Sequence, residues 1–248
     1  MAMKAAKIHI GTSGWNYKHW RGPFYPEDLP ATKWRAFYME RFHTVEINNT
    51  FYQLPGKETF AKWYNDAAPE FIYAVKASRY ITHMKKLKNP EKPLANFLDH
   101  AGQLGEKLGP VLFQLPPRWK CNPERLSAFL AALPEGHRYA FEFRDSSWWD
   151  DKIYELLRDA NAAFCGFDLE GLQSPVELTA DFAYIRLHGP EAAYQGRYKD
   201  ETLSRWAERF QEWIENGVAI YCYFDNDENG YAPNDALRLK AKMGLPKS

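Results

Sequence analysis

The sequence predicts a single parallel (β/α)8 TIM barrel that spans residues 1–248 as one domain. Three observations predict this fold. The chain has 248 residues, a length at which an α/β barrel still forms one domain with a large core. Short runs rich in β-branched and aromatic residues alternate with amphipathic stretches. Neither a break in composition nor an internal repeat divides the chain. A doubly wound open sheet is the alternative architecture.

Eight short runs are predicted to be strands, and they are residues 7–14, 44–51, 72–78, 110–115, 139–145, 163–168, 182–189 and 218–225. Seven amphipathic segments between or after them are predicted to be helices, and they are residues 34–42, 57–66, 93–107, 123–133, 150–161, 201–216 and 234–243. The pair Asn216-Gly217 is a typical helix stop before the last strand. Residues 169–181 contain no convincing helix and are predicted to be irregular or one short turn.

The charge balance and the cysteines exclude several classes of protein. The chain has 32 Lys and Arg against 32 Asp and Glu, and a formal net charge of zero disfavours duplex DNA binding through bulk charge. No apolar run approaches the roughly 20 residues that cross a bilayer, and no secretion signal is evident, so we expect a cytoplasmic protein without membrane contact. Cys121, Cys165 and Cys222 lack CxxC spacing, which predicts neither a disulfide framework nor a thiolate zinc site.

The alternation of side chains along each strand predicts what lies at the carboxyl ends of the barrel strands, where active sites form. In the run 140–144, Phe141 and Phe143 share one face, so Glu142 and Arg144 share the other and point to the barrel axis. The same alternation predicts a mouth lined by Glu46, Asn48, Lys76, Gln114, Glu142, Arg144, Arg186, His188 and Asp225, with Asp168 closing the sixth strand. Convergent charges of both signs indicate an active site. The alternative is a structural ion-pair network such as Glu142–Arg144 or Glu46–Lys76.

The loops after the strands add aromatic residues and one concentration of positive charge. Their aromatic residues predict a rim that stacks on a ligand, or alternatively side chains that pin the loops, and they include Trp15, Tyr17, Trp20, Phe24, Tyr25, Tyr52, Trp119, Trp148, Trp149, Tyr194 and Tyr198. Residues 76–92 hold six Lys and Arg against Glu91 alone, a net charge of +5 before His83 is counted. Basic and aromatic residues together suggest an anionic ligand, such as a phosphate ester, a nucleotide or a nucleic-acid strand.

Motifs for nucleotide cofactors and for zinc are absent. The sequence has no GxGxxG, GxxxxGK[ST], GxSxG or HExxH, so we expect no cofactor. Only His188 at a strand end and His83 in a loop supply imidazoles near the predicted mouth, which predicts no bound metal centre. A single Mg²⁺ held by Glu46, Glu142, Asp168 or Asp225 stays open.

Several blocks along the chain carry a resemblance to a known family. They are Gly11-Thr12-Ser13-Gly14-Trp15 with Tyr17, Phe24-Tyr25-Pro26, Thr44-Val45-Glu46-Ile47-Asn48 with Thr50-Phe51-Tyr52, Val75-Lys76, Ile81-Thr82-His83, Gly109-Pro110, Phe113-Gln114-Leu115-Pro116-Pro117, Glu142-Phe143-Arg144 with Trp148, Arg186-Leu187-His188-Gly189 with Tyr198, Phe224-Asp225-Asn226-Asp227, and Asn234 with Ala236. In this order they resemble the YecE-like family of uncharacterised TIM barrels. The resemblance implies the barrel fold and little about activity. The chain departs from the family at Asp225, where the family often has an asparagine.

Two hypotheses for function follow. The first is an enzyme acting on a small anionic substrate that bears a phosphate or carboxylate group, with a reaction type that the sequence does not indicate. Glu46, Lys76, Glu142, His188 and Asp225 are the predicted catalytic residues; Trp15, Asn48, Tyr52, His83, Gln114, Arg144, Trp148, Arg186, Tyr198 and Asn226 are the predicted substrate-binding residues. The alternative is a nucleic-acid-binding or phosphodiesterase-like protein that holds a strand across the same mouth.

Overall fold

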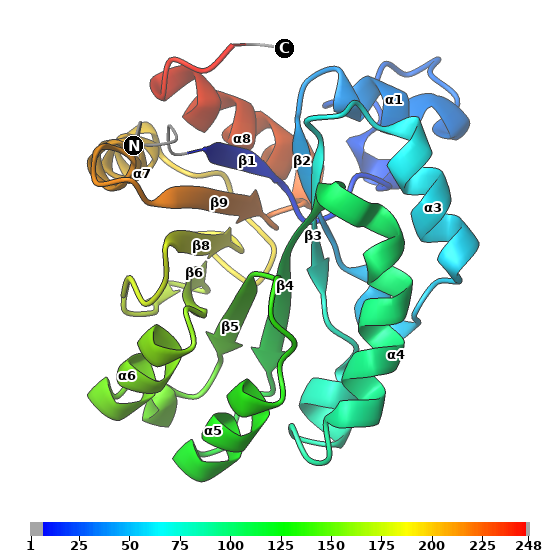
Figure 1. Ribbon diagram of the computed structural model, residues 1–248. Helices are drawn as coiled ribbons and strands as arrows, with labels where there is room; N and C mark the ends of the chain where they lie inside the picture. Colours follow the sequence, from blue (N-terminus) through cyan, green and yellow to red (C-terminus); the bar gives the residue numbers. More distant parts are fainter. Residues whose placement is uncertain (1–6, 247–248) are drawn as a thin grey trace. The chain divides into compact units, whose positions relative to one another are not determined.

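The computed structural model describes residues 7–246 and confirms the predicted (β/α)8 barrel fold. Eight strands lie in the order β1-β9-β8-β6-β5-β4-β3-β2, and a short ninth strand, β7, pairs antiparallel with β6 (Figure 1). The chain divides into two compact units. The described residues of the first unit are 7–46, 166–174 and 181–246, and those of the second unit are 47–165 and 175–180. The expectation of one domain over residues 1–248 stays a prediction.

The first unit contains the strands that begin and end the chain. Its elements are β1 (Ile8–Thr12), the short helices η1 (Lys18–Trp20) and η2 (Ala31–Lys33), α1 (Trp34–Met39), most of β2 (Thr44–Ile47), the end of β6 (Ala163–Leu169), β7 (Leu172–Gln173), β8 (Phe182–Leu187), α7 (Asp200–Glu215), β9 (Ala219–Phe224), η6 (Glu228–Gly230) and α8 (Tyr231–Lys242). Strand β9 pairs in parallel with both β1 and β8, and α7 and α8 pack against it.

The second unit contains the middle of the chain. Its elements are α2 (Asn49–Tyr52), α3 (Lys57–Asp66), β3 (Ile72–Lys76), the π-helix η3 (Tyr80–Met84), α4 (Glu91–Ala101), η4 (Gly102–Lys107), β4 (Leu108–Leu115), α5 (Pro123–Ala131), β5 (Tyr139–Phe143), η5 (Ser146–Trp148), α6 (Asp151–Asp159) and the start of β6. Strand β4 lies between β3 and β5, and all three are parallel (Figure 1).

The predicted alternation of side chains holds on β4 and β5. Phe113 and Phe141 are neighbours in the parallel register, and both rings contact Phe129 of α5, at centroid distances of 5.0 and 6.1 Å. These phenylalanines therefore face the helix layer. Gln114 and Glu142 are the next pair in the register, so they lie together on the opposite face of the sheet.

Three predicted elements differ from the structure. The predicted strand 44–51 ends at Ile47, because Asn48 adopts a helical backbone (φ −105°, ψ −21°) and α2 follows; Thr50 Oγ1 then donates to the Lys76 carbonyl at 2.6 Å. The predicted helix 93–107 stops at Ala101, and Gly105 breaks its extension η4 with φ 52° and ψ −132°, a conformation that glycine reaches at low cost. In the segment predicted to be irregular, β7 forms a short hairpin with β6.

Candidate functional site

The first unit holds a cluster of charged side chains at the carboxyl ends of its strands, which we call the first-unit cluster: Glu46, Arg186, His188 and Asp225. Arg186 Nη2 donates to Glu46 Oε1 at 2.7 Å and to Asp225 Oδ2 at 3.2 Å. Arg186 is 1% exposed and Glu46 is fully buried. The sequence placed these four residues on one face of their strands, and the structure brings them into hydrogen-bond contact.

The hydrogen bonds of His188 determine which of its nitrogens carries the proton. Nδ1 lies 2.9 Å from Asp225 Oδ2, and Nε2 lies 3.3 Å from Arg186 Nη1. A guanidinium group can only donate, so Nε2 accepts and Nδ1 carries the hydrogen that it donates to Asp225. In this arrangement the imidazole is held from both sides.

Glu46 receives further hydrogen bonds from two hydroxyl groups. Ser13 Oγ donates to Glu46 Oε1 at 2.6 Å, and Tyr184 Oη donates to Oε2 at 2.7 Å. Together with Arg186, these donors compensate the cost of burying a carboxylate. Neither Ser13 nor Tyr184 was predicted as a site residue. Strand alternation could have indicated Tyr184, two residues before Arg186.

The electrostatic environment around the first-unit cluster is negative. Burial raises the pKa of Asp168 above its ordinary value, and burial and the nearby Asp225 carboxylate raise the pKa of Asp227. Burial also raises the pKa of the Tyr17 phenol, and the charges of Asp225, Asp227 and Glu46 add to that effect. Arg186 directs its donors at neighbouring side chains. The cluster is therefore suited to hydrogen-bond donors or to proton transfer rather than to an anion.

Asp168 has an unusual environment at the carboxyl end of β6. Its side chain is 4% exposed, and its Oδ1 atom has no hydrogen-bond partner among the described residues. Its backbone carbonyl accepts from the His188 amide at 2.9 Å, which places it beside the first-unit cluster. The sequence placed Asp168 at the end of the sixth strand and named it among the possible ligands of a single Mg²⁺, but did not predict it as a catalytic or binding residue.

The second unit holds a different cluster, which we call the second-unit cluster: Lys76, His83, Glu142 and Arg144. Arg144 Nε donates to the buried Glu142 Oε1, so the predicted ion pair between them is formed. The Lys76 ammonium lies 4.5 Å from the centroid of the Phe51 ring, and the His83 ring meets the same Phe51 ring at 4.9 Å. Phe51 thus gives Lys76 and His83 a common apolar neighbour.

The charged neighbours of His83 make the electrostatic field around its imidazole positive. Burial lowers the pKa of its imidazole to about 4, and the positive charges of Lys76, Arg79 and Arg144 add to this effect. His83 is therefore neutral at pH 7. Its Nδ1 lies 2.9 Å from Thr82 Oγ1, which fixes the ring. Arg79 is one of the six basic residues in segment 76–92, but it was not predicted as a site residue from the sequence.

The remaining predicted residues of the second unit have separate environments. Gln114 donates to the backbone carbonyl of Leu115 at 2.8 Å. Asn48 is half-buried, and its Oδ1 has no hydrogen-bond partner among the described residues. Tyr52 is 75% exposed. Trp148 is 1% exposed and donates to the carbonyl of Trp119 at 2.6 Å, so it pins the loop after β5. A role of these residues in substrate binding stays a prediction.

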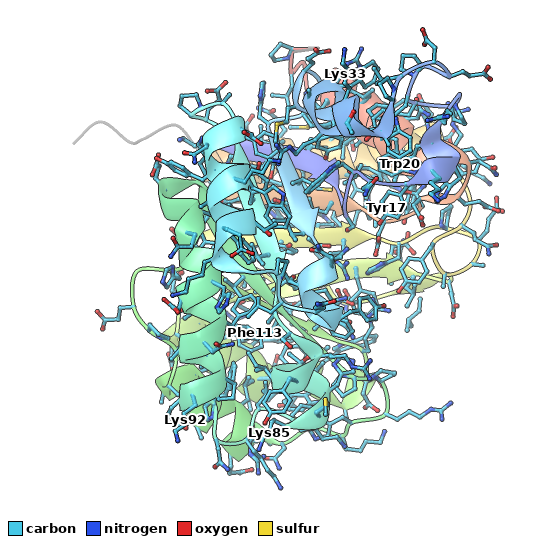
Figure 2. All side chains as sticks on the ribbon, turned by 90° about the vertical axis from the view of Figure 1, so that its right-hand side faces the viewer. Tyr17, Trp20, Lys33, Lys85, Lys92 and Phe113 are labelled. Atoms are coloured by element: carbon cyan, nitrogen blue, oxygen red, sulfur yellow. The ribbon has the colours of Figure 1, made fainter. Side chains whose placement is uncertain are left out.

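In the first unit, the predicted loop residues pack within the structure. The Trp15 carbonyl accepts from the buried Tyr25 hydroxyl, and Figure 2 shows the neighbouring Tyr17 and Trp20, whose ring centroids are 4.7 Å apart. Tyr198 is buried, and its hydroxyl oxygen accepts from the Gly189 amide at 3.0 Å. Asn226 Nδ2 donates to the Gly196 carbonyl and to Asp235 Oδ2, both at 2.9 Å. Roles for Trp15, Tyr198 and Asn226 in binding substrate stay predictions.

Gly189 lets the following loop fold back onto the first-unit cluster. It has φ 125°, and a Cβ atom there would lie 2.2 Å from the Gln195 carbonyl oxygen. The same loop brings the Tyr194 ring to 5.7 Å from the His188 ring, edge to face. Tyr194 is 44% exposed, so it contacts both the buried His188 ring and solvent.

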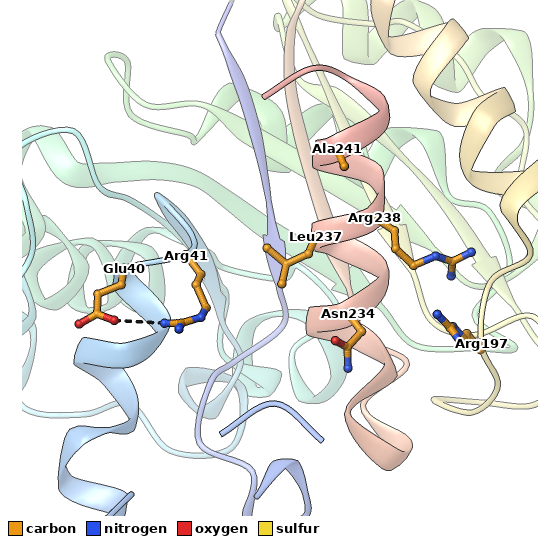
Figure 3. A pocket seen from close by; sticks show the side chains of 7 residues that line it. All are labelled: Glu40, Arg41, Arg197, Asn234, Leu237, Arg238 and Ala241. Carbon is orange, nitrogen blue, oxygen red and sulfur yellow. Dashed lines mark hydrogen bonds and ion pairs between the residues drawn. The ribbon is translucent and has the colours of Figure 1, made fainter. Parts of the chain in front are cut away.

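An open cavity of about 590 Å³ in the first unit contains none of the predicted site residues. It lies between Glu40 and Arg41, at the end of α1, and the outer face of α8 (Figure 3). Arg238, which lines it, donates to Asp235 and Asp200 at 2.7 Å each, and Arg41 pairs with Glu40 at 3.1 Å. These arginines are neutralised by neighbouring carboxylates.

Residues 7–246 lack the features of a metal centre and of a membrane-spanning helix. No three His, Cys, Asp or Glu side chains in this range are grouped so that they could hold a metal ion. No helix in the same range combines the length and apolar character that crossing a membrane requires.

The fold and the two clusters define a (β/α)8-barrel protein with charged side chains at the carboxyl ends of its strands. The chain belongs to the DUF72 family, described as proteins of unknown function, whose model matches residues 9–248. This match and the relative named YecE, described next, confirm the predicted resemblance to the YecE-like family.

Relatives in two bacteria resemble the chain over nearly its whole length. The UPF0759 protein YecE of Escherichia coli K12 is 29% identical, over 91% of this chain and 89% of its own length. The UPF0759 protein YunF of Bacillus subtilis is 23% identical, over 97% and 96%.

Solved structures of the family share the fold. A DUF72 family protein from Thermotoga maritima superposes with a TM-score of 0.87 at 30% identity, over 96% of this chain and 99% of that one. A DUF72 family protein from Enterococcus faecalis superposes with a TM-score of 0.79 at 18% identity, over 97% and 99%.

Proposed function

We propose that the protein is an enzyme that binds a small anionic substrate, bearing a phosphate or carboxylate group, at the second-unit cluster. One arrangement carries this proposal: the Lys76 ammonium and the His83 ring both lie against the Phe51 ring, at 4.5 and 4.9 Å from its centroid. Burial lowers the pKa of the His83 imidazole, and the charges of Lys76, Arg79 and Arg144 lower it further. Against these three cations the cluster holds the Glu142 carboxylate, which leaves an excess of positive charge beside a neutral ring. An anion would be stabilised in that field.

Arg144 is the residue we assign to the anion. It follows directly after β5, so its backbone is fixed by the sheet, and its side chain is 12% exposed. A guanidinium group keeps its charge and presents parallel donors that match a phosphate or carboxylate. Arg186, the other arginine predicted to bind substrate, donates to Glu46, Asp225 and His188, and we therefore assign it to the protein's own carboxylates.

His83 and Glu142 are the groups we assign to the chemistry of this site. A neutral imidazole donates a hydrogen bond to a substrate oxygen without losing a proton, whereas Glu142, oriented by Arg144, is able to accept one. Lys76 supplies charge close to both the Phe51 and His83 rings. The reaction type is not part of the proposal.

Titration calorimetry with inorganic phosphate tests the proposal. We expect Arg144→Ala to lose phosphate binding at millimolar concentrations, because the group that pairs with the anion is removed. Lys86→Ala is the control: Lys86 is an exposed cation of the basic loop, residues 76–92, with its ammonium 5.9 Å from the Trp119 ring centroid. Its loss should weaken binding about twofold, through long-range attraction alone.

Two results would count against this proposal. Equal weakening by Arg144→Ala and Lys86→Ala, with circular dichroism showing both folded, would mean that only diffuse charge attracts phosphate. Absence of phosphate binding to the wild type, combined with oligonucleotide binding that weakens steeply as salt is added, would favour the nucleic-acid alternative.

A further inference from the structure

A second cavity lies in the second unit, beside the basic loop. Its volume is about 700 Å³, within the range of small-molecule sites. It is formed by η3, by the residues that follow η3 and by the start of α4. Figure 2 labels Lys85 and Lys92, two of the residues that line it. None of Lys76, His83, Glu142 and Arg144 lines this cavity, so it is distinct from the second-unit cluster.

The interior of the cavity is apolar and partly aromatic. Ile81 and Phe97, which are 2% and 1% exposed, contribute to its lining, as does Leu54. Tyr80 also lines it and is 44% exposed, which is unusual for a large aromatic side chain. A flat, accessible ring next to buried aliphatic and aromatic groups is suited to a planar apolar ligand.

Two lysines add positive charge to this apolar surface. The Lys85 ammonium lies 5.6 Å from the centroid of the Tyr80 ring, so the charge and the ring are adjacent. Lys92 and Glu91 also line the cavity, and with Lys85 they give its charged side chains a net charge of 2 − 1 = +1. An anionic group attached to a planar ring would therefore meet both kinds of surface.

The backbone around the cavity adopts conformations that are rare in ordinary loops. Tyr80–Met84 is a single π-helical turn, and Lys86, Leu87 and Asn89 have positive φ values of 46°, 62° and 45°. Leu87 is 2% exposed, and its amide donates to the Ile81 carbonyl at 3.0 Å, which fixes this conformation. Such turns and strained residues concentrate at ligand sites.

We propose that this cavity binds an aromatic ring that carries an anionic group, the class of aryl phosphates and aryl carboxylates. The ring would lie against Tyr80, Ile81 and Phe97, and the anionic group would pair with Lys85 and Lys92. The proposal adds a binding site to the protein and does not depend on phosphate binding at Arg144.

Calorimetry with two phosphate monoesters tests this site. Phenyl phosphate carries an aromatic ring on its phosphate group, whereas methyl phosphate carries a methyl group in the same place. The wild type should bind phenyl phosphate about tenfold more tightly, since burial of the ring adds a favourable contribution. Lys92→Ala should reduce phenyl phosphate binding about tenfold through loss of a charge-assisted contact, and should weaken methyl phosphate binding by no more than about twofold.

Two further variants distinguish the loss of binding in the cavity from a general loss of positive charge and from misfolding. Lys88→Ala removes an exposed lysine of the same loop that does not line the cavity, and it should weaken the binding of both esters equally, by no more than about twofold through lost long-range attraction. Asn96→Trp places a large side chain at the cavity lining from an exposed position of α4, and it should remove the preference for phenyl phosphate while the far-ultraviolet spectrum stays unchanged.

Equal affinities of the wild type for the two esters would overturn the proposal. So would equal effects of Lys92→Ala and Lys88→Ala. If Arg144→Ala abolished the binding of both esters while Lys92→Ala and Asn96→Trp had no effect, the aryl anion would belong to the second-unit cluster. That result would refute the cavity site and leave the proposed function standing.

Discussion

The two units place charged side chains at the same kind of position, the carboxyl ends of parallel strands, and surround them with fields of opposite sign. In the first unit, Glu46 and Asp225 pair with Arg186, and burial together with the Asp225 carboxylate raises the pKa of Asp227. In the second unit, Lys76, Arg79 and Arg144 help to lower the pKa of His83 to about 4. A charged strand end thus does not by itself indicate an anion site; the sign of the surrounding field does.

The comparison also separates two kinds of arginine. Arg186 is 1% exposed and pairs with Glu46 and Asp225, whereas Arg144 has a 12% exposed side chain and pairs with Glu142. The first is part of a buried ion-pair network. The second retains contact with solvent, through which a ligand would arrive.

The largest expected effect comes from Arg186→Ala. The variant leaves Glu46 and Asp225 without their shared counter-charge in a buried site, which should lower the free energy of unfolding by about 3–5 kcal/mol. Urea denaturation measures this loss. Adding Glu46→Gln and Asp225→Asn to Arg186→Met should recover part of it, since no uncompensated charge then remains. If Arg186→Ala cost less stability than Arg144→Ala, our distinction between the two arginines would be wrong.

A smaller effect is expected when sulfate binds to the second unit. Sulfate does not titrate in the working range, and its charge would offset the cations around His83. We expect the pKa of His83 to rise by about one unit from its value of about 4, as followed by nuclear magnetic resonance of the imidazole. The bound state then takes up a proton more readily, so sulfate affinity should increase up to about tenfold as the pH falls through this window. An equal shift with sodium chloride at matched ionic strength would contradict anion binding here.

The smallest effect concerns two aspartates, Asp168 and Asp145, whose pKa values are shifted in opposite directions. Burial raises the pKa of Asp168, so its ionised form opposes folding once the pH exceeds the unfolded value. Relative to the wild type, Asp168→Asn should gain stability as the pH rises, on the order of 1 kcal/mol. Hydrogen bonds from Ser147 lower the pKa of Asp145 in the second unit, so Asp145→Asn should lose stability as the pH rises. Thermal denaturation at several pH values measures both, and slopes of the same sign would refute the assignment.

Much of the first-unit cluster could be predicted because strands have a period of two. Glu46, Arg186, His188 and Asp225 were placed on one face from sequence alone, and all four are in hydrogen-bond contact. The same alternation predicted the Glu142–Arg144 pair. Short local periodicity was sufficient because each residue lies in or directly after a regular strand.

The loops could not be predicted in this way. The π-helical turn that brings Arg79 and Thr82 next to His83 has no periodic signature, because its hydrogen bonds depend on a backbone that surrounding contacts hold in place. Trp148, predicted to bind substrate, is buried against Phe143 at a centroid distance of 5.0 Å, and its role in binding stays a prediction. Composition indicates that aromatic residues are abundant, whereas only packing decides which of them remain accessible.

The close approach at Gly189 has a consequence for how this protein can diverge. Any side chain at that position would collide with the Gln195 carbonyl oxygen, so the loop that carries Tyr194 toward His188 and the glycine must be inherited together. A relative with another amino acid there would need a different path for residues 190–197, and with it a different covering over its imidazole. The residue at this one position therefore divides relatives into two groups. Those with glycine can keep the contact between the aromatic ring and the imidazole, and those with another residue cannot keep it with this loop path.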